Sequence, residues 1–215
     1  MINLMYVVLM AMLAMNVSTQ VLDGFSIVEE SLQRSTDNSA KENQSIYGNF
    51  ADQMKSNPEK VREWFEKATA VKRMSDSLYN FAQELKVEIV READGADGDI
   101  HNIERKDDLE AASHVMLAPG TGKGKKLFDA INSFRERILK MVPDAAQHKI
   151  IAGNLSTTLP KNAKTMGKNW QEYMFEDMPV AAAVTLLTKL QNDVRYAEGE
   201  VLHTLVANID MKDIR

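Results

Sequence analysis

A glycine- and lysine-rich stretch, APGTGKGKKL at residues 118–127, is the first candidate for chemistry. A nucleotide-binding P-loop reads G-x-x-x-x-G-K-[S/T], because its backbone N–H groups cradle phosphates and its hydroxyl binds magnesium. Counting from Gly120 puts Lys125 where the second glycine belongs, and no Ser or Thr follows Lys123 or Lys125. No predicted strand leads into the stretch. It therefore predicts a flexible, basic loop that opens a helix.

An acidic stretch, DGADGD at residues 94–99, could bind calcium if its oxygens were suitably spaced. A helix-loop-helix calcium loop needs oxygen ligands at positions 1, 3 and 5, glycine at 6 and glutamate at 12. A loop that starts at Asp94 has Ala96 at position 3 and Asp99 in place of the glycine. A loop that starts at Asp97 has Asn102 in that place. We therefore expect a solvated turn.

The four histidines, His101, His114, His148 and His203, do not show the spacing of metal ligands. His203 lies among leucines and valines of a predicted helix, where we expect a half-buried side chain with a satisfied partner. Catalytic triads are defined by geometry, so sequence order alone assigns none here. The sequence predicts no catalytic residue, no metal site and no cofactor, and we do not expect an enzyme.

The polar side chains Asn3 and Tyr6 stand out because they lie in a stretch without charge. Residues 1–22 contain no Asp, Glu, Lys or Arg, and their apolar core runs from Leu4 to Met15. A membrane-spanning helix needs about 17 to 20 mostly apolar residues, so the stretch predicts a short span. Intramembrane polar groups tend to face a partner, whereas tyrosine is also common at the membrane interface. Both interpretations of Asn3 and Tyr6 remain open.

A repeating apolar seam runs through this span and beyond it. Its members lie alternately three and four residues apart, as in a heptad repeat. Small members inside the span would let two helices approach closely, and large members beyond Asp23 would suit pairing in water. Pairing of two copies is favoured over packing inside one domain. The seam consists of Leu4, Val7, Ala11, Ala14, Ser18, Val21, Phe25, Val28 and Leu32.

The remaining residues predict an acidic helical domain. The net charge of −5 lies entirely after residue 22, which argues against a nucleic-acid partner, and cysteine is absent. A polar stretch after Leu32 predicts a break or helix corner. Apolar periodicity then predicts a long helix from Pro58, shorter helices near 109–117, 123–142 and 145–152, and a closing helix from Pro179 to about Ile209. We expect residues 1–22 to form a transmembrane helix and residues 23–215 an elongated antiparallel helical bundle, in an all-α fold.

The run MINLMYVVLMAMLAMNVSTQVLDGF, followed by this acidic helical domain, resembles the amino-terminal part of the GldM/PorM family. The closing stretch WQEYMFEDMPVAAAVTLLTKLQNDVRYAEGEVL also resembles the end of that family's first periplasmic domain. The family comprises inner-membrane motor proteins of type IX secretion and gliding. Tyr6 matches a family tyrosine within the span. The family's basic stretch before the MINLMY motif and its later β-rich domains have no counterpart here, so we expect a fragment.

The resemblance implies a homodimer whose membrane helices, embedded in lipid, sit inside a ring of a small two-span protein like GldL/PorL. Proton flow through that complex would turn or shift this chain, which acts as the shaft of the motor. Further periplasmic secretion components would receive the movement. The implied location is the bacterial inner membrane, single-pass, with a cytoplasmic amino terminus and the bundle in the periplasm. A membrane-anchored helical sensor or adaptor without a motor role is the alternative. A soluble enzyme with an uncleaved signal segment lacks an active-site cluster.

Overall fold

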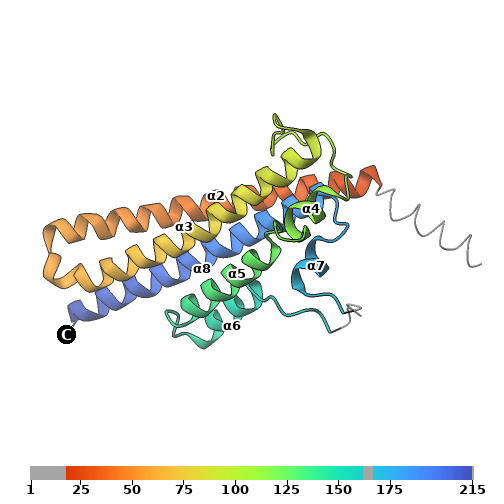
Figure 1. Cartoon of the computed structure of the whole chain (residues 1–215). Helices are drawn as coiled ribbons and strands as arrows, with labels where there is room; N and C mark the ends of the chain where they lie inside the picture. Colours follow the sequence, from red (N-terminus) through yellow and green to blue (C-terminus); the bar gives the residue numbers. More distant parts are fainter. Residues whose placement is uncertain (1–17, 162–166, 215) are drawn as a thin grey trace, which may run out of the picture. The chain divides into compact units, whose positions relative to one another are not determined.

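Helices and connecting loops make up the computed structural model, which describes residues 18–161 and 167–214 (Figure 1). No strand occurs among the described residues, so the predicted all-α class is confirmed. The helices are α2 (Thr19–Ser56), α3 (Pro58–Asp94), α4 (Ala111–Leu117), α5 (Gly124–Leu139), α6 (Ala145–Asn154), α7 (Trp170–Phe175) and α8 (Val180–Ile214).

Most of the predicted membrane span, residues 1–17, lies outside the described residues. Among those that are described, no helix has both the length and the apolar character that crossing a membrane requires. The single transmembrane helix and the domain boundary after residue 22 therefore stay predictions. What is described is that α2 begins at Thr19 and passes this boundary without a break.

Chain contacts divide the protein into two compact units, and each is described by itself. Of the described residues, the first unit comprises 18–31, 83–126, 159–161 and 167–187. The second comprises 32–82, 127–158 and 188–214. The long helices α2, α3 and α8 each contribute residues to both units.

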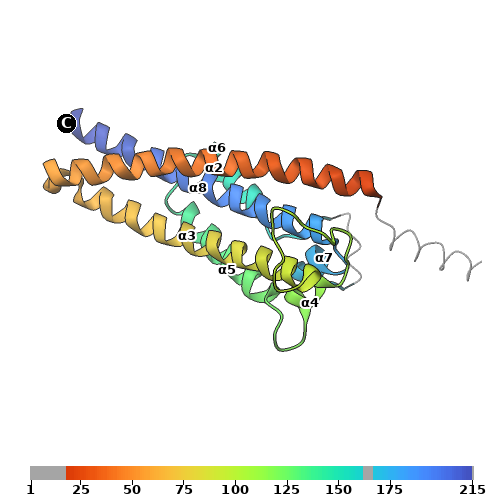
Figure 2. The same ribbon diagram turned by 90° about the horizontal axis from the view of Figure 1, so that it is seen from above.

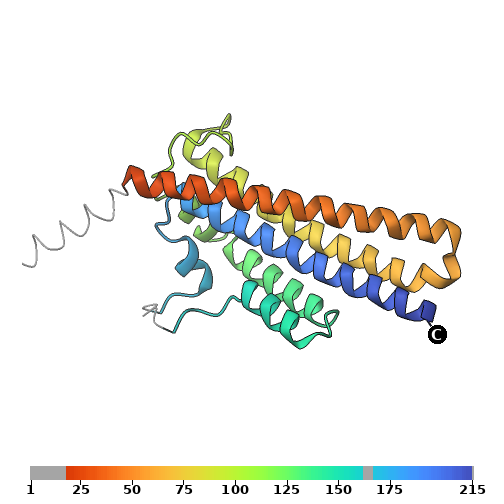
Figure 3. The same cartoon turned by 180° about the vertical axis from the view of Figure 1, so that it is seen from behind.

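In the second unit, α2 and α3 form a helical hairpin with Asn57 as its connecting residue, visible in Figure 2. Proline fits the first position of α3 because it has no N–H to leave unpaired there. α5 and α6 form a shorter hairpin (Figure 3), and the Arg135 guanidinium donates to the Leu155 carbonyl at 2.9 Å near its open end. The Tyr196 hydroxyl on α8 donates to Gln147 of α6 at 2.9 Å.

Apolar periodicity located the buried faces of α3 and α8 correctly. All members of the two predicted faces are buried except Phe65, which is half-exposed. Burial of such a face supplies most of a helix's stability in a protein. The buried members are Val61, Ala68, Val71, Ser75, Leu78, Ala82, Leu85 and Ile89 on α3, and Val180, Val184, Leu187, Val194, Val201 and Leu205 on α8.

The predicted break after Leu32 is wrong, because α2 continues as one helix to Ser56. Its inward positions in the second unit include polar side chains as well as the apolar Phe50. Thr36 and Asn43, seven residues apart, are 1 % and 4 % exposed. The Thr36 hydroxyl donates to the Leu32 carbonyl at 2.7 Å, which satisfies it within the helix. A hydrophobicity pattern does not detect these two positions, because their side chains are polar and are buried together with hydrogen-bond partners.

In the first unit, α4 packs against α7, and a single serine joins them. The Ser113 hydroxyl accepts the Asp177 N–H at 2.8 Å and donates to the Phe175 carbonyl at 3.4 Å. Helix α7 was not predicted, although a capping box marks its first turn. The Asn169 side chain accepts the Glu172 N–H, and the Glu172 carboxylate accepts the Asn169 N–H. This reciprocal pair satisfies donors that a six-residue helix would otherwise leave open.

Candidate functional site

The predicted seam is only partly described by the structure. Asn3 and Tyr6 lie outside the described residues, as do the seam members Leu4, Val7, Ala11 and Ala14. Ser18 precedes α2, and its hydroxyl accepts the Val21 N–H at 3.2 Å, as a helix-capping residue does. Capping is thus the role the structure gives Ser18, and the sequence analysis had placed it in the seam for its small size.

The remaining seam members belong to α2 and differ in exposure. Val21 and Val28, seven residues apart, are 50 % and 49 % exposed, whereas Phe25 and Leu32 are half-buried. Neighbouring Leu22 is 9 % exposed and packs into the first unit. Consecutive residues lie about 100° apart around a helix, so the buried face of α2 is rotated by about one residue from the predicted seam.

We call Val21, Gly24, Ile27 and Val28 the α2 stripe. Its three large side chains are all about half exposed or more, and Ile27 reaches 69 %. A Cβ added to Gly24 would meet no atom within 4 Å, so nothing in the described chain covers this position. An exposed apolar run on one helix is typical of a surface that pairs with another helix. The α2 stripe is the described part of the candidate pairing surface.

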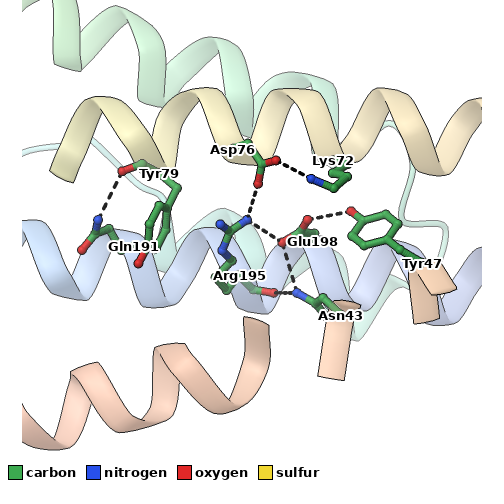
Figure 4. A network of polar contacts seen from close by, with 8 residues as sticks. All are labelled: Asn43, Tyr47, Lys72, Asp76, Tyr79, Gln191, Arg195 and Glu198. Carbon is green, nitrogen blue, oxygen red and sulfur yellow. Dashed lines mark hydrogen bonds and ion pairs between the residues drawn. The ribbon is translucent and has the colours of Figure 1, made fainter. Parts of the chain in front are cut away.

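A buried polar network lies inside the second unit and was missed by the sequence analysis (Figure 4). Its centre is Glu198 on α8, which is 1 % exposed. The Glu198 carboxylate accepts from the Tyr47 hydroxyl at 2.6 Å, from Asn43 at 3.1 Å and from Arg195 at 3.0 Å. Glutamate is almost never fully buried unless it is paired, and these three donors supply its partners.

Arg195 extends the network to α3. Its guanidinium donates to Asp76 at 2.9 Å and lies 4.2 Å from the ring centroid of Tyr79, a cation–π distance (Figure 4). Burial, together with the Glu198 charge, raises the pKa of Tyr47 far above its ordinary value, so the phenol stays protonated. The Asp76 carboxyl has a lowered pKa: burial opposes ionisation, but hydrogen bonds from Lys72 and Arg195 outweigh it.

The network explains how α2 approaches α8 so closely. The Asn43 amide donates to the Arg195 carbonyl at 3.0 Å, and a Cβ added to Gly199 would lie 2.9 Å from the Asn43 oxygen. Because buried polar groups must be paired, this arrangement fixes which turn of α2 faces which turn of α8. Its role is structural: three donors satisfy the Glu198 carboxylate, although the buried Arg195 Nε has no hydrogen-bond partner among the described residues.

The motifs that could have carried chemistry serve the backbone instead. The Asp94 carboxylate accepts the N–H groups of Glu104 and Arg105 at 2.8 and 2.9 Å, which closes the acidic loop. Within the described ranges, no three His, Asp or Glu side chains are grouped to hold a metal ion. His203 is exposed rather than half-buried, and its Nε2 lies 3.2 Å from Glu42.

The glycines of the 118–127 stretch are also accounted for by packing. A Cβ on Gly122 would lie 2.7 Å from the Met116 carbonyl oxygen, and one on Gly124 would lie 2.7 Å from the Gln171 side chain. Gly120 has a φ of +78°, which favours glycine. The glycine spacing that resembles a phosphate loop therefore reflects a tight backbone turn between α4 and α5.

The chain is similar to a known protein family over most of its length. A family model described as the GldM N-terminal domain matches residues 20–208, most of the chain, so the protein belongs to the GldM family. The predicted resemblance is confirmed. Family membership supports a role as a component of type IX secretion or gliding motility. No curated protein matches the chain.

Proposed function

We propose that this chain is a force-transmitting subunit of a proton-motive-force-driven inner-membrane motor that powers type IX secretion or gliding. Family membership supports the assignment to the type IX secretion or gliding machinery. The single observation that carries the mechanical role is the course of α2, which runs for 38 residues from the end of the proposed span without a loop. A flexible tether would take up movement in a Gly/Ser/Pro linker, whereas a helix passes it on.

In this proposal, residues 1–22 span the inner membrane and the described units stand in the periplasm. A ring of small two-span membrane proteins surrounds the span, where Asn3 and Tyr6 face lipid or that partner. The chain acts as a homodimer, and the α2 stripe continues the pairing that begins in the membrane. Further periplasmic secretion components receive the movement.

Mechanical coupling predicts that a flexible insert will separate the membrane from the bundle. Inserting seven Gly/Ser residues after Gly24 is expected to abolish secretion or gliding while the protein remains membrane-bound and folded. A seven-residue Ala-rich helical insert at the same place is the control. Seven helical residues make about two full turns, so the side chains after the insert keep their direction relative to those before it. This variant should therefore retain clearly more activity than the flexible insert. Secretion by cells that carry each insert gives the measurement.

Normal secretion with the flexible insert would contradict force transmission through α2. It would favour the alternative role of a membrane-anchored sensor or adaptor, for which a slack connection is harmless. Membrane fractionation and limited proteolysis of both insert proteins confirm that the units remain folded.

Pairing through the α2 stripe predicts a specific disulfide crosslink. The chain has no cysteine, so a single introduced thiol reports on one position only. Val28→Cys is expected to give a covalent dimer on mild oxidation of membranes, because the two copies of Val28 would face each other. Glu30→Cys is the control, since it is exposed on the opposite side of α2. Non-reducing electrophoresis measures the outcome, and equal crosslinking at both positions would refute this pairing.

A further inference from the structure

A cleft in the first unit is lined by no residue of the α2 stripe and has no role in the proposed force transmission. It has a volume of about 350 Å³ and is formed by the last turns of α3, by α4 and by the loop that enters α5. Ligand pockets in proteins begin at about 300 Å³. The cleft therefore has room for a small organic acid or for the last residue or two of a peptide.

The wall made by the α4–α5 loop is held in place by backbone contacts. The Gly122 N–H donates to the Ala118 carbonyl at 2.7 Å, and the Lys123 N–H donates to the Val115 carbonyl at 3.1 Å. The absence of a Cβ at Gly122 lets this loop pass close to the end of α4. The cleft is thus formed before any ligand arrives, which lowers the entropic cost of binding.

The acidic groups of the cleft are already engaged by basic groups of the same cleft. Glu88 on α3 is paired with the Lys123 ammonium across the opening. Glu92, one turn later, lies 2.9 Å from Nδ1 of His114. These two pairs join α3 to the loop and to α4, and they occupy both carboxylates.

What remains open in the cleft is one cation and one hydroxyl. The Arg91 side chain is exposed, and its guanidinium has no hydrogen bond or ion pair among the described residues; the Thr121 hydroxyl has none there either. The guanidinium carries five N–H donors in a planar fork that matches the two oxygens of a carboxylate. The Thr121 hydroxyl, which lines the same cleft, can donate a third hydrogen bond.

We propose that this cleft binds a carboxylate, held by the Arg91 guanidinium and the Thr121 hydroxyl. The carboxylate belongs to a small organic acid or to the carboxyl terminus of a peptide. Val115, which is half-buried in the wall of the cleft, offers an apolar surface to the carbon atoms next to the carboxylate. The Lys123–Glu88 and His114–Glu92 pairs fix the distance between the walls of the cleft that the ligand enters.

The test uses the whole chain in a non-ionic detergent and three probes. Succinate represents a free acid, acetyl-Gly-Gly-Ala with a free carboxyl terminus represents a peptide end, and the same peptide with an amidated terminus lacks the carboxylate. Saturable shifts of the Thr121 and Lys123 amide resonances are expected with succinate, with the free peptide or with both. The amidated peptide is expected to cause none. Which acid binds more tightly identifies the source of the carboxylate.

Two matched variants decide whether Arg91 carries the binding. Arg91→Gln is expected to weaken binding by about tenfold or more, because a charge-assisted bidentate contact is lost. Arg73→Gln removes an exposed arginine from the same helix outside the cleft and should leave affinity unchanged. Absence of saturable shifts with both acids would overturn the proposal. So would equal affinity in Arg91→Gln, or binding of the amidated peptide as tight as that of the acid.

Discussion

Replacing Glu198 by alanine is expected to lower the free energy of unfolding by about 3 to 5 kcal/mol, the usual loss when one partner of a buried ion pair is removed. Glu198 is 1 % exposed and accepts from three donors: the Tyr47 hydroxyl, the Asn43 amide and the Arg195 guanidinium. Alanine leaves all three donors without this acceptor, at a position where the Glu198 side chain is almost wholly buried. Each unpaired buried group adds its own desolvation penalty.

Glu63→Ala is the matched control, because it removes the same carboxylate from an exposed position of the second unit. Glu63 lies 3.3 Å from Lys67, and both side chains are largely exposed. A surface pair of this kind contributes less than about 1 kcal/mol. Urea unfolding followed by circular dichroism measures both variants. A loss in Glu198→Ala no larger than that in Glu63→Ala would show that the network does not stabilise the bundle.

A double variant separates two quantities: the net contribution of the Arg195–Glu198 ion pair to stability, and the loss of stability when one charge is left buried without its partner. Arg195→Met combined with Glu198→Met removes both charges and fills the space with apolar atoms. Its loss is expected to be smaller than the sum of the two single losses, because neither charge is left buried alone. Additive losses would mean that Arg195 and Glu198 act independently, with Asp76 as the dominant partner of the guanidinium.

The same residues show which parts of the fold a sequence can predict. On α3 and α8 the buried positions are apolar and recur with the helical period, so their faces were found from residues alone. On α2 the buried positions of the second unit include Thr36 and Asn43, and the polar stretch around them suggested a break. The partners that make these positions buried, Asn192 and Glu198, lie about 150 residues further along the chain. Pattern analysis within a window cannot bring them together.

Pairing through the seam stays a prediction, but the structure shows how far its described members on α2 are exposed. The predicted seam has large apolar members on both sides of Asp23, and two of them, Val21 and Val28, are exposed on α2. The sequence did not show that Phe25 would turn partly into the first unit, where its carbonyl lies 3.4 Å from the Thr185 hydroxyl. A heptad repeat records which residues share a face. It does not record whether a neighbouring helix of the same chain or a second copy covers that face.

Gly122→Ala is expected to destabilise the first unit by about 1 to 3 kcal/mol, the usual range for forcing atoms into a well-packed site. The added Cβ would lie 2.7 Å from the Met116 carbonyl oxygen and 2.8 Å from that of Ala118. These obstacles are backbone atoms, which cannot swing aside as a flexible side chain can. The loop must therefore move away from the end of α4, which strains the 2.7 Å hydrogen bond from the Gly122 N–H to the Ala118 carbonyl.

Thr121→Ala is the control, because the neighbouring side chain is exposed and its loss should change stability by less than about 0.5 kcal/mol. Hydrogen exchange of the Lys123 amide, which donates to Val115, measures the local effect, and urea unfolding measures the global one. Faster exchange in Gly122→Ala alone would identify the glycine as a packing requirement. Equal exchange in the two variants would contradict a tight turn here and reopen a functional explanation of the glycines.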